Sequence, residues 1–175
     1  MEIVLDSVSL NHLLRGSRKV RERFSDSVGT PIDQAINEGC LKLALDSAKG
    51  LISEWGTTCG AEIVHVLITK WESQRGLFII EPLGKLSSAQ RKHLSAYGFN
   101  DTCDKLILRI AIATEDRIVV SDDSDFWDPN KIANYGNKNA PVARLIREEL
   151  DITLLNLKAL MEQLSLILKQ TQKKT

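Results

Sequence analysis

Arg117-Ile-Val-Val-Ser-Asp-Asp-Ser-Asp-Phe-Trp-Asp128 is the stretch that decides the fold. Its three consecutive apolar residues, Ile118 to Val120, predict a short buried strand. Asp122, Asp123 and Asp125 follow the end of that strand, and carboxylates so close together repel one another unless a positive charge lies among them. Because open α/β sheets bind ligands at the carboxyl ends of their strands, this stretch predicts a divalent-cation site. A solvated acidic turn is the alternative.

Strand and helix patterns alternate on both sides of this stretch. Short apolar, β-branched runs predict further strands, and helical spacing of apolar residues, with capping residues and prolines at the expected ends, predicts the helices. The expected strands are residues 2–5, 41–45, 77–80, 118–120 and 151–155, and the expected helices are residues 7–14, 31–37, 51–67, 89–97, 102–113, 141–150 and 157–168. Such alternation predicts an α/β fold, a three-layer α/β/α sandwich with a mostly parallel central sheet.

Acidic residues recur where these predicted elements begin or end. Asp6 closes the first strand, Glu54 and Asp104 lie in the first turns of two helices, and Asp123 and Asp125 follow the central strand. In a parallel sheet the strand ends and the following helix starts share one edge, so these acids are expected to meet there. Mg²⁺ and Mn²⁺ prefer such oxygen ligands, and a metal held this way can lower the pKa of a water molecule for phosphodiester hydrolysis.

At these residues the chain resembles the PIN domain family of metal-dependent nucleases. The similarity covers roughly residues 2–164 and is carried by the order and spacing of several motifs. These are Ile3-Val-Leu-Asp6-Ser-Val-Ser-Leu10, Ala44-Leu-Asp46-Ser-Ala-Lys-Gly-Leu-Ile-Ser-Glu54-Trp55, the helix Asp104 to Thr114, Ile118-Val-Val-Ser-Asp-Asp123-Ser-Asp125-Phe126 and Ile152-Thr-Leu-Leu155. The most specific of them is the pair formed by the helix Asp104 to Thr114 and the stretch that follows it.

The resemblance implies a single PIN-like domain over residues 1–168, followed by a polar tail at 169–175. It implies a hydrolase, an endoribonuclease that uses Mg²⁺ or Mn²⁺ and a water nucleophile. The implied catalytic and metal-binding acids are Asp6, Glu54, Asp104 and Asp123, with Asp125 as an auxiliary metal ligand. Asp122 stands where the family more often has a neutral residue, so the sequence leaves open which of Asp122 and Asp123 points inward. Asp46 is interpreted as a turn residue.

Composition and charge exclude several other classes. Hydrophobic residues at 43% and charged residues at 26% are ordinary for a globular protein, and no apolar run approaches the ~20 residues that span a bilayer. The first residues lack the basic segment of a signal peptide, so we expect a cytoplasmic protein without a membrane partner. Three widely spaced cysteines form neither a disulfide framework nor a zinc pattern.

A basic run near the N-terminus is the candidate nucleic-acid contact, because clustered cations can bind phosphates. A solvated helix face is the alternative interpretation. The run consists of Arg15, Arg18, Lys19, Arg21 and Arg23.

Three alternatives stay open at this point. The domain could be a catalytically silent PIN-like module that binds RNA or a protein. The nuclease could be the toxin of a toxin–antitoxin or defence pair, with an antitoxin as its partner, and the leucine-rich last helix could serve either the core or a homodimer. A phosphatase with an aspartyl nucleophile is disfavoured, because Asp6-Ser-Val supplies only one of the two acids that such enzymes place after the first strand.

Overall fold

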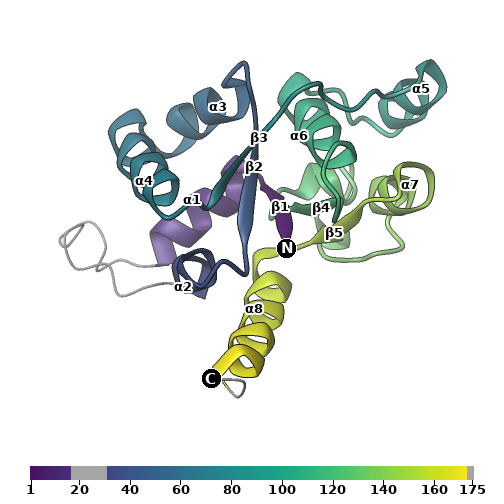
Figure 1. Cartoon of the computed structure of the whole chain (residues 1–175). Helices are drawn as coiled ribbons and strands as arrows, with labels where there is room; N and C mark the ends of the chain where they lie inside the picture. Colours follow the sequence, from purple (N-terminus) through teal and green to yellow (C-terminus); the bar gives the residue numbers. More distant parts are fainter. Residues whose placement is uncertain (17–30, 173–175) are drawn as a thin grey trace.

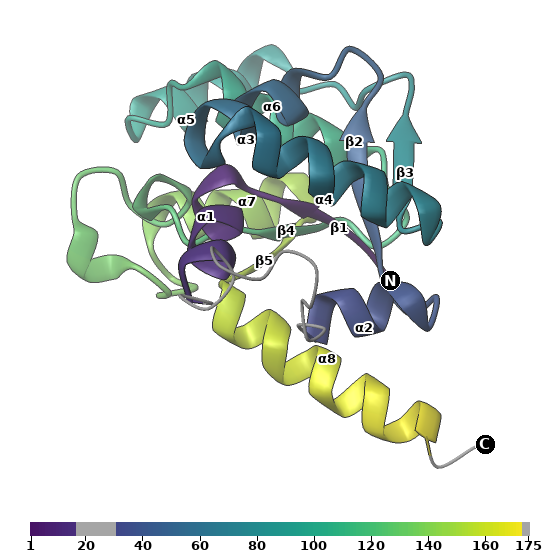
Figure 2. The same cartoon turned by 90° about the vertical axis from the view of Figure 1, so that its left-hand side faces the viewer.

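A computed structural model describes residues 1–16 and 31–172 of the chain. Within this part the chain forms a five-stranded, all-parallel sheet with the strand order β3-β2-β1-β4-β5. Helices cover both faces of the sheet, which makes the molecule a three-layer α/β/α sandwich (Figures 1 and 2). The predicted fold class is therefore confirmed.

The strands lie close to their predicted positions. They are β1 (Glu2–Leu5), β2 (Lys42–Asp46), β3 (Leu77–Ile80), β4 (Ile118–Val120) and β5 (Thr153–Leu155). In β1, β2, β4 and β5 every residue after the first is buried, since parallel strands with helices on both faces have no solvent-exposed side. The backbone N–H of Asp6 donates to the carbonyl of Val120 at 2.9 Å, which holds the carboxyl ends of β1 and β4 together.

The helices connect these strands. They are α1 (Ser7–Gly16), α2 (Pro31–Asn37), α3 (Gly50–Cys59), α4 (Ala61–Ser73), α5 (Ser88–Ala96), α6 (Thr102–Ile112), α7 (Pro141–Leu150) and α8 (Leu157–Gln172). Two short 3₁₀ turns, Ser124–Phe126 and Ile132–Asn134, follow β4. In Figure 1 the sheet is seen from the side of β3, with α1, α3 and α4 on the left and α5, α6 and α7 on the right. Helix α8 packs against α2 and extends away from the sheet (Figure 2).

Two sequence predictions about helices are wrong. The single helix predicted over residues 51–67 is two helices, because Gly60 adopts φ 100°, a conformation that ends α3 and begins α4. The helix predicted over residues 157–168 is longer than predicted, since α8 continues through Gln172. No helix among the described residues is long and apolar enough to cross a membrane.

Candidate functional site

Aspartates from three segments gather at the carboxyl edge of β1 and β4. Asp6 follows β1 directly, Asp123 and Asp125 follow β4, and Asp104 lies in the first turn of α6. Helix α6 packs against β1 and β4, and this brings its N-terminal turn to the same edge of the sheet. We call Asp6, Asp101, Asp104, Asp123 and Asp125 the acidic cluster, because the charges of these residues act on one another.

Asp6 is the buried member of the acidic cluster. Its Oδ2 accepts a hydrogen bond from the Ser121 hydroxyl at 2.9 Å, and the backbone N–H groups of Ser7 and Val8 also donate to the carboxylate. Burial, reinforced by the charge of Asp123, nevertheless raises the pKa of Asp6 to about 6. The donors hold the carboxylate in place, but they do not compensate for its removal from water.

Asp104 carries the largest perturbation in the acidic cluster. Burial, together with the charges of the other acids of the cluster, raises the pKa of its carboxyl to about 8. Burial and the charges of Asp123 and Asp101 also raise the pKa of Asp125. The cluster is thus a place where the protein would gain from a positive charge.

The adjacent acids Asp122 and Asp123 face different surroundings. Asp122 accepts hydrogen bonds from the Tyr135 hydroxyl at 2.8 Å and from the backbone N–H of Leu157 at 2.9 Å, and its other oxygen lies 3.0 Å from Nδ1 of His12. Asp123 receives the backbone N–H of Asp125 at 2.9 Å and acts on the carboxyls of Asp6 and Asp104. The structure therefore places Asp123 in the acidic cluster and Asp122 at the start of α8.

Glu54 lies at the margin of the acidic cluster. Its Oε1 is within 3.4 Å of the hydroxyls of Ser7 and Thr58, and its carboxylate also interacts with the thiol of Cys103. Ser7 and Cys103 are the sequence neighbours of Asp6 and Asp104, so Glu54 faces the cluster from α3. The pKa of Cys103 is raised to about 11, first by burial and then by the charge of Glu54.

Asp46 performs a different task at the same edge of the sheet. Its two carboxylate oxygens accept the backbone N–H groups of Gly50 at 2.8 Å and Leu51 at 2.9 Å, which satisfies the first turn of α3. This is the turn role that the sequence predicts for it. Asp101 does the same for α6, where it accepts from the backbone N–H groups of Cys103 and Asp104. Besides capping α6, Asp101 acts through its charge on the carboxyls of Asp104 and Asp125.

The acidic cluster offers the type of side-chain atom that a hard divalent cation binds. They are all carboxylate oxygens, which Mg²⁺ and Mn²⁺ prefer. Within residues 1–16 and 31–172, no group of three His, Cys, Asp or Glu side chains is drawn together tightly enough to coordinate a metal as placed. The carboxylates repel one another, and a bound cation would relieve this repulsion, which adds to the effect of burial in raising the pKa of Asp104.

A groove lined by cations runs along the neighbouring face of α6. It has a volume of about 820 Å³ and lies between the segment before α5 and the first turns of α6. We call it the basic groove, after its four cationic residues Lys85, Arg91, Lys105 and Arg109, and no Asp or Glu lines it. Sequence reasoning missed these residues, because they are scattered over two segments; the only signal was the spacing of Lys105 and Arg109, which share one helix face.

The basic run singled out in the sequence is only partly described. Arg15 is at the exposed end of α1, where its Nε donates to Asn11 at 3.0 Å and its charge acts on Cys59. Arg18, Lys19, Arg21 and Arg23 lie outside the described residues. The three tryptophans are buried, as expected for packing rather than for stacking on bases, and the three cysteines are free thiols.

Comparison of the chain with protein-family models, with curated proteins and with solved structures finds no match. The site must therefore be interpreted from its own chemistry.

Proposed function

We propose that this protein is a metal-dependent nuclease that hydrolyses RNA, on the pattern of the PIN domain family that its sequence resembles. The observation that carries the proposal is the gathering of Asp6, Asp104 and Asp123 from three separate segments in a partly buried place, where burial and the neighbouring charges together raise the pKa of Asp104 to about 8. Stability alone does not favour such an arrangement, because every added carboxylate raises the free energy of the metal-free fold.

The side chains of the site would have two tasks, to bind the metal and to position the acids that bind it. Asp6, Asp104 and Asp123 would hold Mg²⁺ or Mn²⁺, with Asp125 and Glu54 beside them. Ser121 positions two of these acids, since its hydroxyl donates to Asp6 and accepts from the backbone N–H of Asp123 at 3.0 Å. A divalent cation bound there supplies Lewis acidity toward a phosphodiester and lowers the pKa of a water molecule.

The basic groove supports a polyanionic substrate. Lys105 follows Asp104 directly, so a strand whose phosphates contact Lys105 and Arg109 passes close to the acidic cluster. Phosphate contacts of this kind contribute affinity without sequence readout, and they weaken as salt rises. Nuclease activity on this scaffold is therefore expected to depend strongly on ionic strength.

The experiment is cleavage of a labelled single-stranded RNA by purified protein with Mn²⁺, Mg²⁺ or EDTA. Cleavage by the wild-type chain is expected with a divalent metal only, and Asp104→Asn and Asp123→Asn should each abolish it. Glu62→Gln is the matched control, because Glu62 is likewise an acid in the first turn of a helix but is exposed on α4. Calorimetric titration with Mn²⁺ provides a second readout, in which the two Asn variants should bind the metal more weakly.

A silent RNA-binding module is the alternative outcome of this experiment. Unchanged RNA binding with no turnover under either metal, together with no Mn²⁺ binding, would exclude the nuclease. Equal cleavage by wild-type protein and by Asp104→Asn would point to a contaminant. A single-stranded DNA of the same sequence, added in parallel, decides between RNA and DNA as substrate.

A further inference from the structure

The polar side chains of the basic groove are almost all hydrogen-bond donors, since besides its four cations it carries the hydroxyls of Ser87, Ser88 and Thr102. Ser87 Oγ accepts the backbone N–H of Gln90 at 3.2 Å. Ser88 Oγ accepts an N–H of the Arg91 guanidinium at 3.3 Å. Each of these two hydroxyls keeps its own proton to donate. The side-chain oxygen of Gln90 is occupied by the backbone N–H of Ser87, so a ligand of this groove must be rich in acceptors.

The positive charge of the basic groove is not neutralised within the described part of the protein. None of its four cations forms an ion pair with a carboxylate there. Backbone carbonyls orient three of the cations: Leu86 accepts from Arg91 at 2.7 Å, Asn100 from Lys105 at 2.9 Å and Gly84 from Arg109 at 3.0 Å. A neutral acceptor fixes the direction of a cation without cancelling its charge, so the groove keeps its full positive charge for a ligand.

The two walls of the basic groove, the segment 84–91 and α6, are tied together by Gly84 and Arg109. The N–H of Gly84 donates to the carbonyl of Arg109 at 2.9 Å, and Nε of Arg109 donates back to the carbonyl of Gly84 at 3.0 Å. A Cβ at residue 84 would lie only 2.8 Å from that carbonyl oxygen and 2.5 Å from Ile112, so this close approach requires glycine. The cations of the two walls are therefore held in place before any ligand binds.

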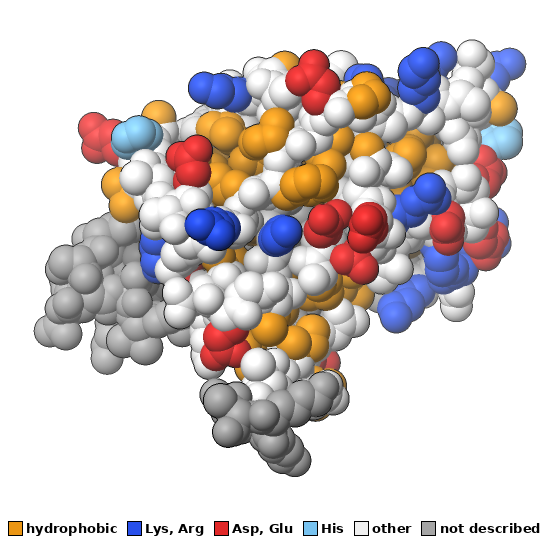
Figure 3. All heavy atoms as spheres, in the orientation of Figure 1, with side chains coloured by type: hydrophobic (Ala, Val, Ile, Leu, Met, Phe, Trp, Pro, Cys, Tyr) orange, Lys and Arg blue, Asp and Glu red, His pale blue; other side chains and the backbone are white. Residues whose placement is uncertain are grey.

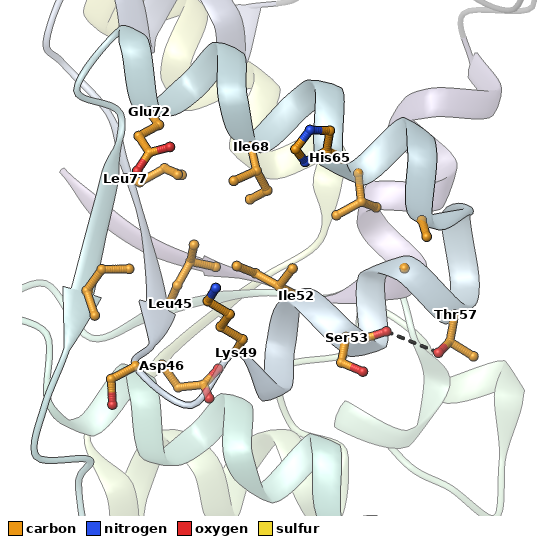
Figure 4. Close-up of a pocket in the computed structure, with 15 residues that line it drawn as sticks. Leu45, Asp46, Lys49, Ile52, Ser53, Thr57, His65, Ile68, Glu72 and Leu77 are labelled. Atoms are coloured by element: carbon orange, nitrogen blue, oxygen red, sulfur yellow. Dashed lines mark hydrogen bonds between the residues drawn. The ribbon is translucent and has the colours of Figure 1, made fainter.

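A second groove offers a different chemistry. It has a volume of about 840 Å³ and lies between β3, α3 and α4. Figure 4 shows the apolar side chains of Ile52, Ile68 and Leu77 in it, together with both signs of charge, from Lys49 and Glu72. Figure 3 shows the same mixture on the β3 side of the molecule, where hydrophobic side chains extend across the middle with Lys, Arg, Asp and Glu among them. A strongly anionic ligand therefore fits the basic groove and not this one.

We propose that the basic groove binds the terminal phosphate monoester of an RNA strand. A monoester carries about 1.5 to 2 negative charges and three acceptor oxygens, whereas each internal phosphodiester carries a single charge. Lys85 and Arg91 flank such a group from one wall, and Lys105 and Arg109 flank it from the other. The planar forks of the two arginines match phosphate oxygens in pairs. RNA as the carrier of the phosphate rests on the proposed function, because the acidic cluster lies next to the groove.

The basic groove lies at a fixed distance from the acidic cluster along α6. Arg109 is five residues beyond Asp104, which is about 7.5 Å at a rise of about 1.5 Å per residue. A stacked strand advances about 3.4 Å per nucleotide, so this distance corresponds to about two nucleotides. A terminal phosphate bound beside Arg109 thus places one of the first phosphodiester bonds of the strand at the acids. The protein is therefore expected to cut RNA near a phosphorylated end.

Binding of internally labelled RNA in EDTA tests the groove without catalysis. Three single-stranded oligomers of one sequence carry a 5′-phosphate, a 3′-phosphate or hydroxyls at both ends, and fluorescence anisotropy measures their dissociation constants. One phosphorylated oligomer is expected to bind at least about tenfold more tightly than the hydroxyl form, which also identifies the end that is recognised. Equal affinity for all three would overturn the proposal, as would tighter binding of a phosphoserine peptide than of either phosphorylated RNA.

Variants of the groove test where the phosphate binds. The readout is the ratio of the affinities for phosphorylated and hydroxyl RNA, since a general loss of positive charge lowers both affinities alike. Lys85→Gln and Arg91→Gln should each lower this ratio several-fold. Lys92→Gln is the matched control, because Lys92 is the exposed neighbour of Arg91 on α5 but does not line the groove, and it should leave the ratio unchanged. A ratio that both groove variants retain, or that the control lowers equally, would refute this binding site.

Mapping of the cleavage positions with Mn²⁺ separates the groove from the acidic cluster. Cuts are expected within about three nucleotides of the recognised phosphorylated end, and hydroxyl RNA should be cut more slowly and without a fixed position. Selective binding in EDTA with no cleavage under Mn²⁺ or Mg²⁺ would support the phosphate site and exclude the nuclease. Metal-dependent cleavage at positions that do not depend on the terminal phosphate would support the nuclease and overturn the role of the groove in recognising an end.

Discussion

Replacing Asp104 with Asn should make the metal-free protein more stable, although the same change should abolish its activity. In the folded chain the pKa of Asp104 is about 8, against 3.8 for a free aspartate. Between these two values the unfolded chain has lost its proton while the folded chain keeps it, so folding costs more as pH rises. The penalty from Asp104 is absent below the unfolded pKa and complete above the folded pKa. An Asn at this position carries no such penalty.

The size of the effect follows from the shift. A difference of about four pKa units corresponds to about 5–6 kcal/mol at about 1.4 kcal/mol per unit, as an upper bound. Neighbouring carboxyls share the repulsion, and Asp6 itself keeps its proton to about pH 6, so we expect about 2–3 kcal/mol above pH 8. At about pH 3, which is below the unfolded pKa, the difference between variant and wild type should be close to zero. This pH dependence separates a relieved charge from a general packing effect.

Urea unfolding without metal measures this difference at both pH values. Glu62→Gln is the control for loss of an acid from the first turn of a helix, which costs about 0.3–1 kcal/mol whatever the cluster does. Saturating Mg²⁺ should stabilise the wild-type protein by about 2.7 kcal/mol at one hundred times the dissociation constant and should stabilise Asp104→Asn much less. If Asp104→Asn is no more stable than wild type above pH 8 without metal, the crowding argument is refuted.

Three further predictions concern single parts of the site. Asp123→Asn should abolish cleavage with little loss of stability. Asp122→Asn should lower the free energy of unfolding by about 1–3 kcal/mol, because two hydrogen bonds lose their charged acceptor and His12 loses its anionic partner. Urea melts and cleavage assays on the same samples check both expectations. The double variant Lys85→Ala/Arg109→Ala should raise KM for RNA several-fold at unchanged kcat and should reduce the salt dependence of binding, and an unchanged slope of log Kd against log salt would remove the basic groove from the substrate path. Asp46→Ala should cost about 0.5–2 kcal/mol through loss of the α3 cap and should leave Mn²⁺ binding intact, as calorimetry would detect.

The sequence predicts the layers of the fold well, and it also predicts the edge of the sheet at which the acidic residues lie, because both follow from short-range pattern. The alternation of apolar runs with helical spacing determines a parallel sheet, and in a parallel sheet any acid directly after a strand lies at the ligand-binding edge. Asp6 and Asp123 follow from that rule, and Asp104 follows from its place in the first turn of a helix that shares this edge. The break at Gly60 does not, because a helical pattern continues on both sides of it, and only the tertiary packing of α4 against α3 requires the turn.

The direction in which a side chain points cannot be predicted from short-range sequence pattern. Asp122 and Asp123 are chemically identical neighbours, and their roles depend on what lies across from each one. Successive side chains after a strand alternate in direction, so Ser121 and Asp123 share the side that faces Asp6 while Asp122 faces α8. The absolute choice between the two sides depends on Tyr135 and on the start of α8, which are distant in the chain. The basic groove could not be predicted for the same reason, since α6 and the segment before α5 are brought together only in the folded chain.

The contrast between these two neighbours also explains how the fold can retain a repulsive cluster. Asp122 is surrounded by two hydrogen-bond donors and His12, so its charge stabilises the junction of β4, α1 and α8. That junction fixes the backbone at Ser121 and Asp123, which cannot then move away from Asp6 to relieve the repulsion. The carboxylates of the acidic cluster thus remain close together without a metal, and the free energy stored in their proximity is what a bound cation would release. Loosening the junction should therefore weaken metal binding even when every acid of the cluster is present.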